Sequence, residues 1–362
     1  MERPAPPSEP VAPERHTPLR QTLLAWYDAS RRRLPWRALP GETADPYAVL
    51  VSEIMLQQTT VATVTGRYAA FLERFPDLAT LAAAPLDDVL HAWQGLGYYR
   101  RARALHACAV AVAAQHDGRL PGSVAGLRAL PGIGAYTAAA VAAIAFGEAA
   151  VPVDANVERV LARLIGLQEP LPRGRRQIDR AAASLAREER SADFAQAVME
   201  LGALVCTPRA PRCMLCPWQG DCVAAASGLQ EELPRRKAKA ARPTREAVAY
   251  LLRREDGAVL FRRRPEEGLL GGMIELPSSA WGERPADLHA EAPAAAAWRL
   301  LPGEVRHVFT HFALVLRLAE AHVATPPPGL WAQPAEFSSL ALPTLTKKLL
   351  RHAGLGCRGD AR

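Results

Sequence analysis

No apolar stretch of this chain reaches the length of about 18 residues that a membrane-spanning helix needs. Nothing at its beginning resembles a secretory signal, and the acids Glu2, Glu9 and Glu14 argue against a mitochondrial transit peptide, which is typically poor in acids. We therefore expect a soluble, cytoplasmic protein without membrane contact. Cytosolic cysteines are normally reduced, so a disulfide is the weakest interpretation of the six cysteines.

The length and the charge of the chain limit its class. Its 362 residues exceed the size of about 250–300 residues at which one hydrophobic core stops growing, so two domains are expected. The formal net charge of +7 favours a polyanionic partner, and binding through Lys and Arg would weaken as the salt concentration rises. Charge alone is weak support for such a partner.

The pattern of the sequence changes near Arg245. Up to about Cys222 it is rich in alanine, with apolar residues three and four positions apart, which predicts helices. From Arg245 onward, strand-like segments and an Asp256-Gly257 turn predict a mixture of strands and helices. We expect five parts: a disordered proline-rich tail (1–18), an all-α domain (19–223), a basic connector (224–244), an α+β domain (245–356) and a short tail (357–362).

Four of the six cysteines fall within seventeen residues, with the spacing C-x6-C-x2-C-x5-C. Such short intervals let one loop surround a single inorganic centre with four thiolates, as in iron–sulfur clusters and closed structural zinc sites. Thiolates suit both metals, so the ligand set by itself leaves the two open. The four are Cys206, Cys213, Cys216 and Cys222.

A glycine-containing turn, LPGIGAYT at positions 130–137, lies between two predicted helices. Gly132 and Gly134 allow positive φ and close backbone approach, so the N–H groups that begin the second helix can point at a phosphate. This arrangement is a helix-hairpin-helix, a sequence-independent anchor for the DNA backbone. For the PGIG motif taken alone, a plain turn between packed helices is an equal alternative.

Together these motifs resemble the endonuclease III superfamily of DNA base-excision glycosylases, whose cluster loop has the same 6-2-5 order of cysteines. The resemblance implies a [4Fe–4S] cluster on the four thiolates. Twenty-two positions after Gly132 comes Asp154, at the start of a predicted helix where it could serve only as an N-cap. In the superfamily an Asp at this place faces the scissile sugar.

Superfamily members that also cut the strand carry a lysine just inside the helix after the hairpin, where it forms a Schiff base with the sugar. Here Tyr136 takes that position, and its neighbours Ala135 and Thr137 offer no amine. The chain therefore resembles the MutY-type adenine DNA glycosylases, which remove adenine opposite 8-oxoguanine or guanine with water as the nucleophile. The resemblance covers nearly everything from Leu23 to Cys222 and, less specifically, the C-terminal part.

The second carboxylate lies in SEIMLQQT at positions 52–59, which matches the family's SExMLQQT motif. Its apolar company suggests a buried acid, whose pKa desolvation raises so that it keeps its proton near neutral pH. The resemblance implies that Glu53 protonates adenine N7 and also activates the water. Asp154 would stabilise the sugar cation or act as a transient nucleophile, as in glycoside hydrolysis by two carboxylates, and Tyr136 would hydrogen-bond within this pair.

The resemblance assigns further contacts with the substrate. Arg37 and Glu200 would contact the flipped adenine, and Tyr98 in the GLGYY segment at 95–99 would wedge into the duplex, offsetting part of the cost of base extrusion. Without the motifs these would be an ordinary surface arginine, helix-face acid and helix-start aromatic. The full set expected in the helical domain is Trp36, Arg37, Gln58, Thr59, Leu96, Tyr98, Asn156 and Glu200.

The second domain resembles a Nudix fold, because GGMIELP at 271–277 matches the strand that enters a Nudix box. The R-E-x-x-E-E cluster that would hold Mg²⁺ does not follow, so we expect recognition rather than pyrophosphate hydrolysis. Phe309, Thr310 and His311 match the family's F-S-H loop, which contacts 8-oxoguanine, with threonine in place of serine. The added methyl group can alter the fit to the lesion.

We thus expect a monomeric enzyme, associated with the nucleoid, that acts on double-stranded DNA containing A:8-oxoguanine or A:G mispairs. Six basic residues and two prolines at 233–245 predict a connector that touches DNA or a repair or replication protein, or equally a solvated linker. Two other functions remain open: an endonuclease III-like glycosylase and lyase, and a catalytically silent mismatch-binding protein.

Overall fold

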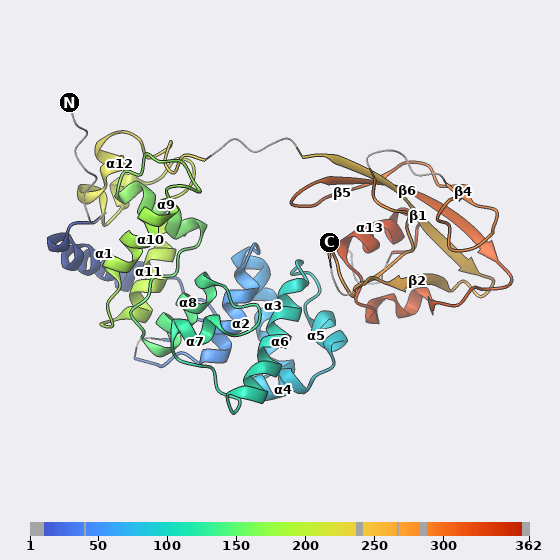
Figure 1. The fold of residues 1–362 in the computed structure, drawn as a ribbon, viewed down its shortest axis with the longest axis horizontal. Coiled ribbons are helices and arrows are strands. Elements are labelled where there is room, and N and C mark those ends of the chain that lie inside the picture. Colours follow the sequence, from blue (N-terminus) through green and yellow to red (C-terminus); the bar gives the residue numbers. More distant parts are fainter. Residues whose placement is uncertain (1–10, 40, 237–241, 266–267, 283–287, 357–362) are drawn as a thin grey trace. The chain divides into compact units, whose positions relative to one another are not determined.

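The structure is a computed structural model, and it divides into two compact units (Figure 1). The first unit comprises residues 1–83 and 104–238, and the second comprises 84–103 and 239–362. The residues that the structure describes are 11–39, 41–236, 242–265, 268–282 and 288–356.

The first unit is helical, as predicted. Short polar residues begin several of its helices: Asp45 accepts a hydrogen bond from Ala48 N at the start of α2, and Ser123 caps α7 in the same way. The elements are η1 (Pro13–Arg15), α1 (His16–Ser30), α2 (Pro46–Leu56), α3 (Val61–Arg74), α4 (Leu78–Ala83), most of α6 (Arg100–Gln115), α7 (Val124–Arg128), α8 (Ala135–Phe146), α9 (Ala155–Leu164), α10 (Arg175–Leu185), α11 (Ser191–Leu204), η2 (Cys213–Leu215), η3 (Gln219–Asp221) and α12 (Val223–Ala226).

The proline-rich beginning of the chain is structured over more of its length than we expected. Val11 is 1% exposed and belongs to the same core as α1, α9, α10 and α11. His16 Nε2 lies 2.9 Å from Val11 O, and α1 begins at His16. Pro13 opens a helical turn, where a missing N–H costs nothing, so proline content misled the prediction for residues 11–18. Positions 1–10 and 357–362 lie outside the described residues.

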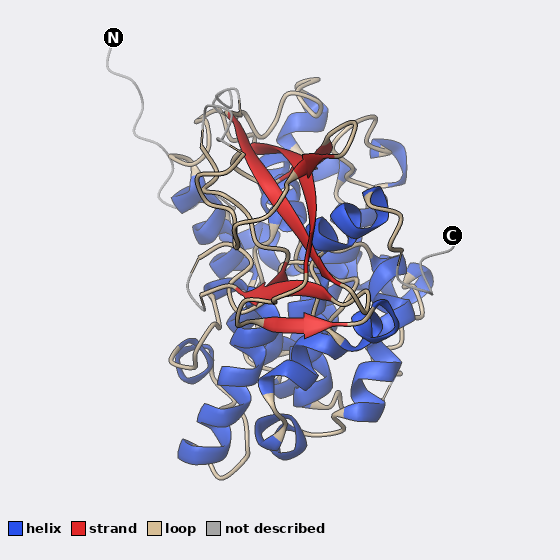
Figure 2. Ribbon diagram, turned by 90° about the vertical axis from the view of Figure 1, so that its right-hand side faces the viewer, coloured by secondary structure: helices blue, strands red, loops and turns tan. Residues whose placement is uncertain are grey.

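The second unit is a mixed sheet with helices, which confirms the α+β prediction (Figure 2, strands in red). Its strands are β1 (Thr244–Arg254), β2 (Val259–Arg263), β3 (Ile274–Glu275), β4 (Arg299–Leu300), β5 (Val305–Val308), β6 (Ala313–Val323) and β7 (Leu330–Ala332). They run in the order β3-β2-β1-β6-β4, with β5 beside β6 and β7 beside β2. The helices are α5 (Leu86–Ala92), η4 (Pro334–Ser339) and α13 (Thr344–His352).

Strand β1 is the centre of this unit, because it pairs in parallel with β6 along its whole length. Its side chains alternate between two apolar layers, as the two-residue period of a strand requires. Ala247, Ala249 and Leu251 pack in one layer with α13, while Val248 and Tyr250 pack in the other. Both faces of the strand are therefore buried.

The segment 84–103 groups with the second unit, although the sequence placed it within the helical domain. Arg263 of β2 forms an ion pair with Asp87 of α5 at 2.9 Å, and Gln94 Nε2 donates to Leu340 O at 2.8 Å. A local helical pattern predicts a helix but not its packing partner, so this grouping could not be predicted from the sequence.

Candidate active site and cluster loop

Glu53 lies in the last two turns of α2, which packs beside α8 in the first unit (Figure 1). Its side chain is almost wholly buried, with the residue 5% exposed. Burial raises the pKa of Glu53 to about 7, and the nearby charge of Asp154 acts in the same direction, while a hydrogen bond from Tyr136 and the charge of Arg37 oppose the rise. Glu53 can therefore both hold and release a proton near neutral pH.

Tyr136 is the second residue of α8 and points at this carboxyl group. Its hydroxyl donates to Glu53 Oε2 at 2.6 Å and lies 3.3 Å from Met199 Sδ of α11. Burial, together with the charge of Glu53, raises the pKa of Tyr136 well above its ordinary value. The phenol thus stays protonated and acts as a fixed donor to Glu53.

Asp154 is the N-cap of α9, and its side chain is held by three hydrogen bonds. Oδ1 accepts from the backbone N–H groups of Asn156 at 2.9 Å and Val157 at 2.7 Å, while Oδ2 accepts from Asn156 Nδ2 at 2.9 Å. Asp154 therefore does cap α9. The same carboxylate contributes to the electrostatic field at Glu53, so the structure brings the two predicted acids into one site.

Arg159, which the sequence did not single out, joins this site to the cysteine loop. Its guanidinium donates to Asn156 Oδ1 at 2.9 Å, to Gly202 O at 2.8 Å and to Cys206 O at 2.7 Å. Asn156 thereby hydrogen-bonds on one side to Asp154 and on the other to Arg159, which contacts the cysteine loop. A buried arginine one turn after an N-cap gives no local motif by which it could have been found.

Glu200 and Arg37 lie together, as the resemblance implied, but they contact each other. The side chain of Glu200 has no exposure and accepts from Arg32 Nε and from an Arg37 terminal nitrogen, both at 2.7 Å. Although burial acts the other way, the hydrogen bonds from Arg32 and Arg37 lower the pKa of Glu200 to about 2. Arg32 was missed, and its place in the RRR triplet before PWR was the available signal.

The remaining predicted contacts of the first unit lie at turns. Gln58 has φ of 57° directly after α2 and is exposed, followed by the half-buried Thr59. Gly132 has φ of 72° and packs against Ala104, where a Cβ would clash. Gly134 is the N-cap of α8 and has no side chain that could accept a hydrogen bond from the first N–H groups of this helix. A helix that anchors a phosphate needs such uncapped N–H groups. Trp36 packs edge-on against Tyr68 with ring centroids 5.6 Å apart.

In the second unit the structure gives different exposures to two residues that were both expected to contact the substrate. Leu96 is 4% exposed, whereas Tyr98 is 46% exposed and has a positive φ of 47°. Tyr98 is accessible to a ligand, whereas Leu96 is buried. The contact of Leu96 with substrate remains a prediction that its burial does not favour.

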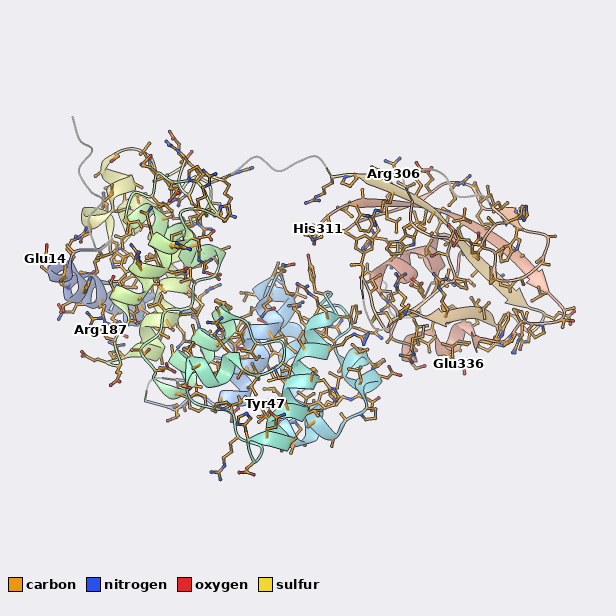
Figure 3. The ribbon with its side chains drawn as sticks, in the orientation of Figure 1. Glu14, Tyr47, Arg187, Arg306, His311 and Glu336 are labelled. Atoms are coloured by element: carbon orange, nitrogen blue, oxygen red, sulfur yellow. The ribbon has the colours of Figure 1, made fainter. Side chains whose placement is uncertain are left out.

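Phe309 to Phe312 form the turn between β5 and β6, where Figure 3 labels His311. Phe309 N donates to Phe312 O at 2.9 Å and closes the turn. The Phe309 ring stacks on Trp281, with centroids 5.6 Å apart and an interplanar angle of 21°. Thr310 and His311 are exposed at the tip, so a rigid aromatic base presents two polar side chains.

The four cysteines of the loop line one cavity together with Arg163. Arg163 donates to Cys206 Sγ at 3.2 Å and to Thr207 O at 2.8 Å. Among the described residues, no three His, Cys, Asp or Glu side chains are arranged to hold a single metal ion. Thiols that surround a cavity fit a cluster with one cysteine per iron.

Three family models match the chain. They are the HhH-GPD superfamily of base excision DNA repair proteins at residues 51–186, the iron-sulfur binding domain of endonuclease III at 206–222 and the NUDIX domain at 248–352. The adenine DNA glycosylase of Homo sapiens is 36% identical over 92% of this chain and 74% of its own length. The chain belongs to the adenine DNA glycosylase family. The corresponding protein of Mycolicibacterium smegmatis is 50% identical over 54% of this chain and 66% of its own.

Solved structures agree with this assignment at the level of fold. A thermostable thymine-DNA glycosylase superposes with a TM-score of 0.54 at 30% identity, covering 59% of this chain and 98% of that one. An endonuclease III–DNA complex gives 0.50 at 21% identity, covering 60% and 99%.

As a family member, the glycosylase is a base excision repair enzyme that releases adenine from DNA and carries an iron–sulfur cluster of the [4Fe–4S] type. The predictions of family, fold, cofactor and reaction are thereby confirmed. Among the described residues, none of the helices combines the length and apolar character required to cross a membrane.

Proposed function

We propose that this adenine DNA glycosylase acts on adenine paired with 8-oxoguanine or guanine and cuts the glycosidic bond without cutting the strand. The observation that carries the proposal is the Tyr136–Glu53 hydrogen bond of 2.6 Å in the electrostatic field of Asp154. A hydroxyl stands where a strand-cutting relative would need an amine. The site therefore supports proton transfer and lacks the imine-forming group.

The reaction follows from the protonation states of the two acids. Glu53 gives its proton to N7 of the extruded adenine, the bond between C1′ and N9 breaks, and its electron pair leaves with the base. Asp154, fixed by its three hydrogen bonds, stabilises the positive charge on the sugar or bonds to it transiently. A water oxygen then attacks C1′, and its proton returns to Glu53. The products are free adenine and an abasic site.

The cysteine loop has a structural role in this proposal. Cys206, Cys213, Cys216 and Cys222 would hold the [4Fe–4S] cluster, which cross-links the loop when bound. Arg159 connects the loop to Asn156, and Asn156 holds Asp154.

Contact with the base opposite adenine is assigned to exposed residues, and the adenine pocket is assigned mainly to residues that are partly or wholly buried. Tyr98 would enter the duplex, while Thr310 and His311 at the β5–β6 turn would contact 8-oxoguanine. Trp36, Arg37, Gln58, Thr59 and Glu200 would surround the adenine and the nearby strand, and Gly132 and Gly134 would bind its backbone. The +7 charge supports a DNA substrate, and we propose that the protein works as a monomer at the nucleoid.

The connector is part of the proposal in a narrower form than the sequence suggested. Residues 224–226 belong to α12, and Leu171 N donates to Arg235 O at 2.9 Å, so the described beginning of the connector packs on the helical unit. Lys237 and Lys239 lie outside the described residues. Arg242 is exposed and is proposed to bind DNA backbone or a repair or replication protein.

The test is base release from duplex oligonucleotides with adenine opposite 8-oxoguanine, guanine or thymine. We expect free adenine from the first two pairings, no release from A:T, and an intact strand until alkali is added. Borohydride should trap no adduct. If neither mispaired duplex releases adenine, the proposed substrate is wrong. A strong covalent adduct would refute hydrolysis with water as the nucleophile.

A Thr310→Ser variant tests the assignment of the β5–β6 turn. If this turn contacts the lesion, removing one methyl group changes the ratio of rates for A:8-oxoguanine and A:G without changing the rate for A:G. An unchanged ratio in Thr310→Ser and in His311→Ala would place lesion recognition elsewhere.

A further inference from the structure

The second unit contains a cavity that the proposed reaction does not use. It has a volume of about 420 Å³, within the range of about 300–1,000 Å³ typical of small-ligand sites. Arginines from β1, β2 and the segment after β2 line it, with two aromatic rings and two serines. The residues that matter here are Arg245, Arg262, Arg264, Ser278, Trp281 and Phe312.

The arginines are held in place by groups at the edge of the cavity. Glu275, with a side chain 6% exposed, accepts from Arg262 Nε at 2.9 Å and from an Arg264 terminal nitrogen at 2.8 Å. Ser278 Oγ accepts from the other end of Arg262 at 3.2 Å. Burying the Glu275 carboxylate lowers the free energy of unfolding unless its pairing geometry is good. The two arginines that it orients keep their remaining N–H groups for a ligand.

The cavity keeps an excess of positive charge. Among the described residues, its three guanidinium groups have two carboxylates near them. Glu275 pairs with Arg262 and Arg264 without lining the cavity, whereas Glu291 lines it and already accepts from Ala280 N at 2.9 Å. In the part of the chain that the structure describes, no acidic side chain forms an ion pair with Arg245, and its guanidinium lies 4.4 Å from the Phe312 ring centroid. The side chain of Arg262 is about half exposed, so an incoming anion can reach it.

Flat surfaces lie next to these charges. The Arg264 guanidinium lies 4.8 Å from the Trp281 ring centroid, and Trp281 Nε1 donates to Ser278 Oγ at 3.3 Å. A planar ring can stack on such aromatic and guanidinium planes, while a phosphate pairs with the free arginine N–H groups. One ligand class has both parts.

We propose that this cavity binds a nucleoside 5′-phosphate, with the base against Trp281 or Phe312 and the phosphate on Arg245 and Arg262. The ligand is bound and not hydrolysed, because Glu291 is the acidic residue among the described lining and one carboxylate does not hold a catalytic Mg²⁺ cluster. The source of the nucleotide is either the free pool or a DNA strand, since both present the same chemistry.

The site has a physical connection to the β5–β6 turn. Trp281 stacks on Phe309, and the Phe309 and Phe312 centroids are 5.0 Å apart, so both aromatic walls of the cavity touch the turn that carries Thr310 and His311. A bound nucleotide would therefore fix the rings beneath that turn. This link rests on the proposed function, whereas binding itself does not.

The test is calorimetric titration of the full-length, cluster-containing protein with deoxyguanosine 5′-monophosphate, deoxyadenosine 5′-monophosphate, deoxyguanosine and inorganic phosphate. We expect the nucleotides to bind at one site, and both the nucleoside and phosphate alone to bind at least about tenfold more weakly. Arg245→Gln should weaken nucleotide binding by about tenfold, because it removes one charged contact. Arg299→Gln, on a side chain 73% exposed and outside the cavity, is the matched control and should change nothing.

Competition with duplex DNA separates the two sources. If a saturating nucleotide leaves duplex affinity unchanged, the site takes free nucleotides; if it weakens duplex binding in wild type but not in Arg245→Gln, the site takes a nucleotide of the strand. Equal binding by wild type, Arg245→Gln and Arg299→Gln would overturn the proposal, as would phosphate that binds as tightly as the nucleotides. Adenine release from a mispair is scored separately and stands or falls independently.

Discussion

Replacing Tyr136 by phenylalanine tests the coupling at the centre of the site. The phenol donates to Glu53 Oε2 at 2.6 Å and so stabilises the ionised carboxylate, which lowers the pKa of Glu53 against the effect of burial. A hydrogen bond to a charged group contributes about 1.5–3 kcal/mol, and one pKa unit corresponds to about 1.4 kcal/mol. Its loss should therefore raise the pKa of Glu53 by about one to two units.

The assay is the single-turnover rate of adenine release as a function of pH. Glu53 must be protonated to act as the acid, so the wild-type rate should fall as the pH rises through about 7. In Tyr136→Phe this fall should begin at a pH higher by about one to two units, since the proton is held more tightly. The pKa rises because the Tyr136 hydroxyl stabilises the ionised Glu53 carboxylate, so its loss favours the protonated form.

Tyr47→Phe provides the matched control. Tyr47 is a buried tyrosine on α2, the helix that carries Glu53, and it is labelled in Figure 3. Its hydroxyl donates to Phe75 O at 2.7 Å, not to Glu53. This variant should lose stability and keep the wild-type pH profile. A pH limb that does not move in Tyr136→Phe, or that moves equally in Tyr47→Phe, would refute the assignment.

Three further changes have defined outcomes. Burial raises the pKa of Glu53 from 4.5 to about 7, which lowers the free energy of unfolding by about 3 kcal/mol above pH 7 and not at all below pH 4.5. In chemical denaturation, Glu53→Gln should therefore gain stability over wild type as the pH rises from 5 to 8, and a gain that is independent of pH would contradict this reasoning. Arg32→Leu leaves the buried carboxylate of Glu200 with Arg37 alone and should lower the free energy of unfolding by about 2 kcal/mol. Arg190→Leu breaks two exposed pairs, with Asp28 and Asp193, and should cost about 1 kcal/mol or less; equal losses in the two variants would be inconsistent with the burial argument. Cys216→Ala should lower the bound iron measured per chain, and Cys108→Ala on α6 should not; iron retained by the first variant would exclude Cys216 as a ligand.

The sequence predicted those features that depend on residue identity at fixed spacing. The four cysteines line one cavity and Asp154 begins a helix, as their local spacing indicated. The hydrogen bond between Tyr136 and Glu53 joins residues 83 positions apart, and it was implied by the family resemblance and not by local spacing. The change of pattern near Arg245 correctly separated helices from sheet, because the short continuous apolar run of β1 beside a turn is a local signal of a buried strand.

The sequence did not predict features that depend on long-range packing. Arg32, Arg159 and Arg163 meet their partners 168, 47 and 43 positions away, and an arginine gives no local sign of burial. Proline content suggested disorder at residues 11–18, where a buried Val11 instead fixes the chain to the core. Leu96 and Tyr98 belong to one motif, yet a positive φ at Tyr98 turns one side chain outward and leaves the other inside.

Base release from duplexes that contain 7-deazaadenine opposite 8-oxoguanine tests the central claim most directly. This base has carbon in place of N7, so it offers Glu53 no atom to protonate, while its shape and its pairing edge are those of adenine. We predict that adenine is released and the deaza base stays attached, although both duplexes bind the enzyme equally. Release of both bases at similar rates would contradict proton transfer from Glu53 to N7.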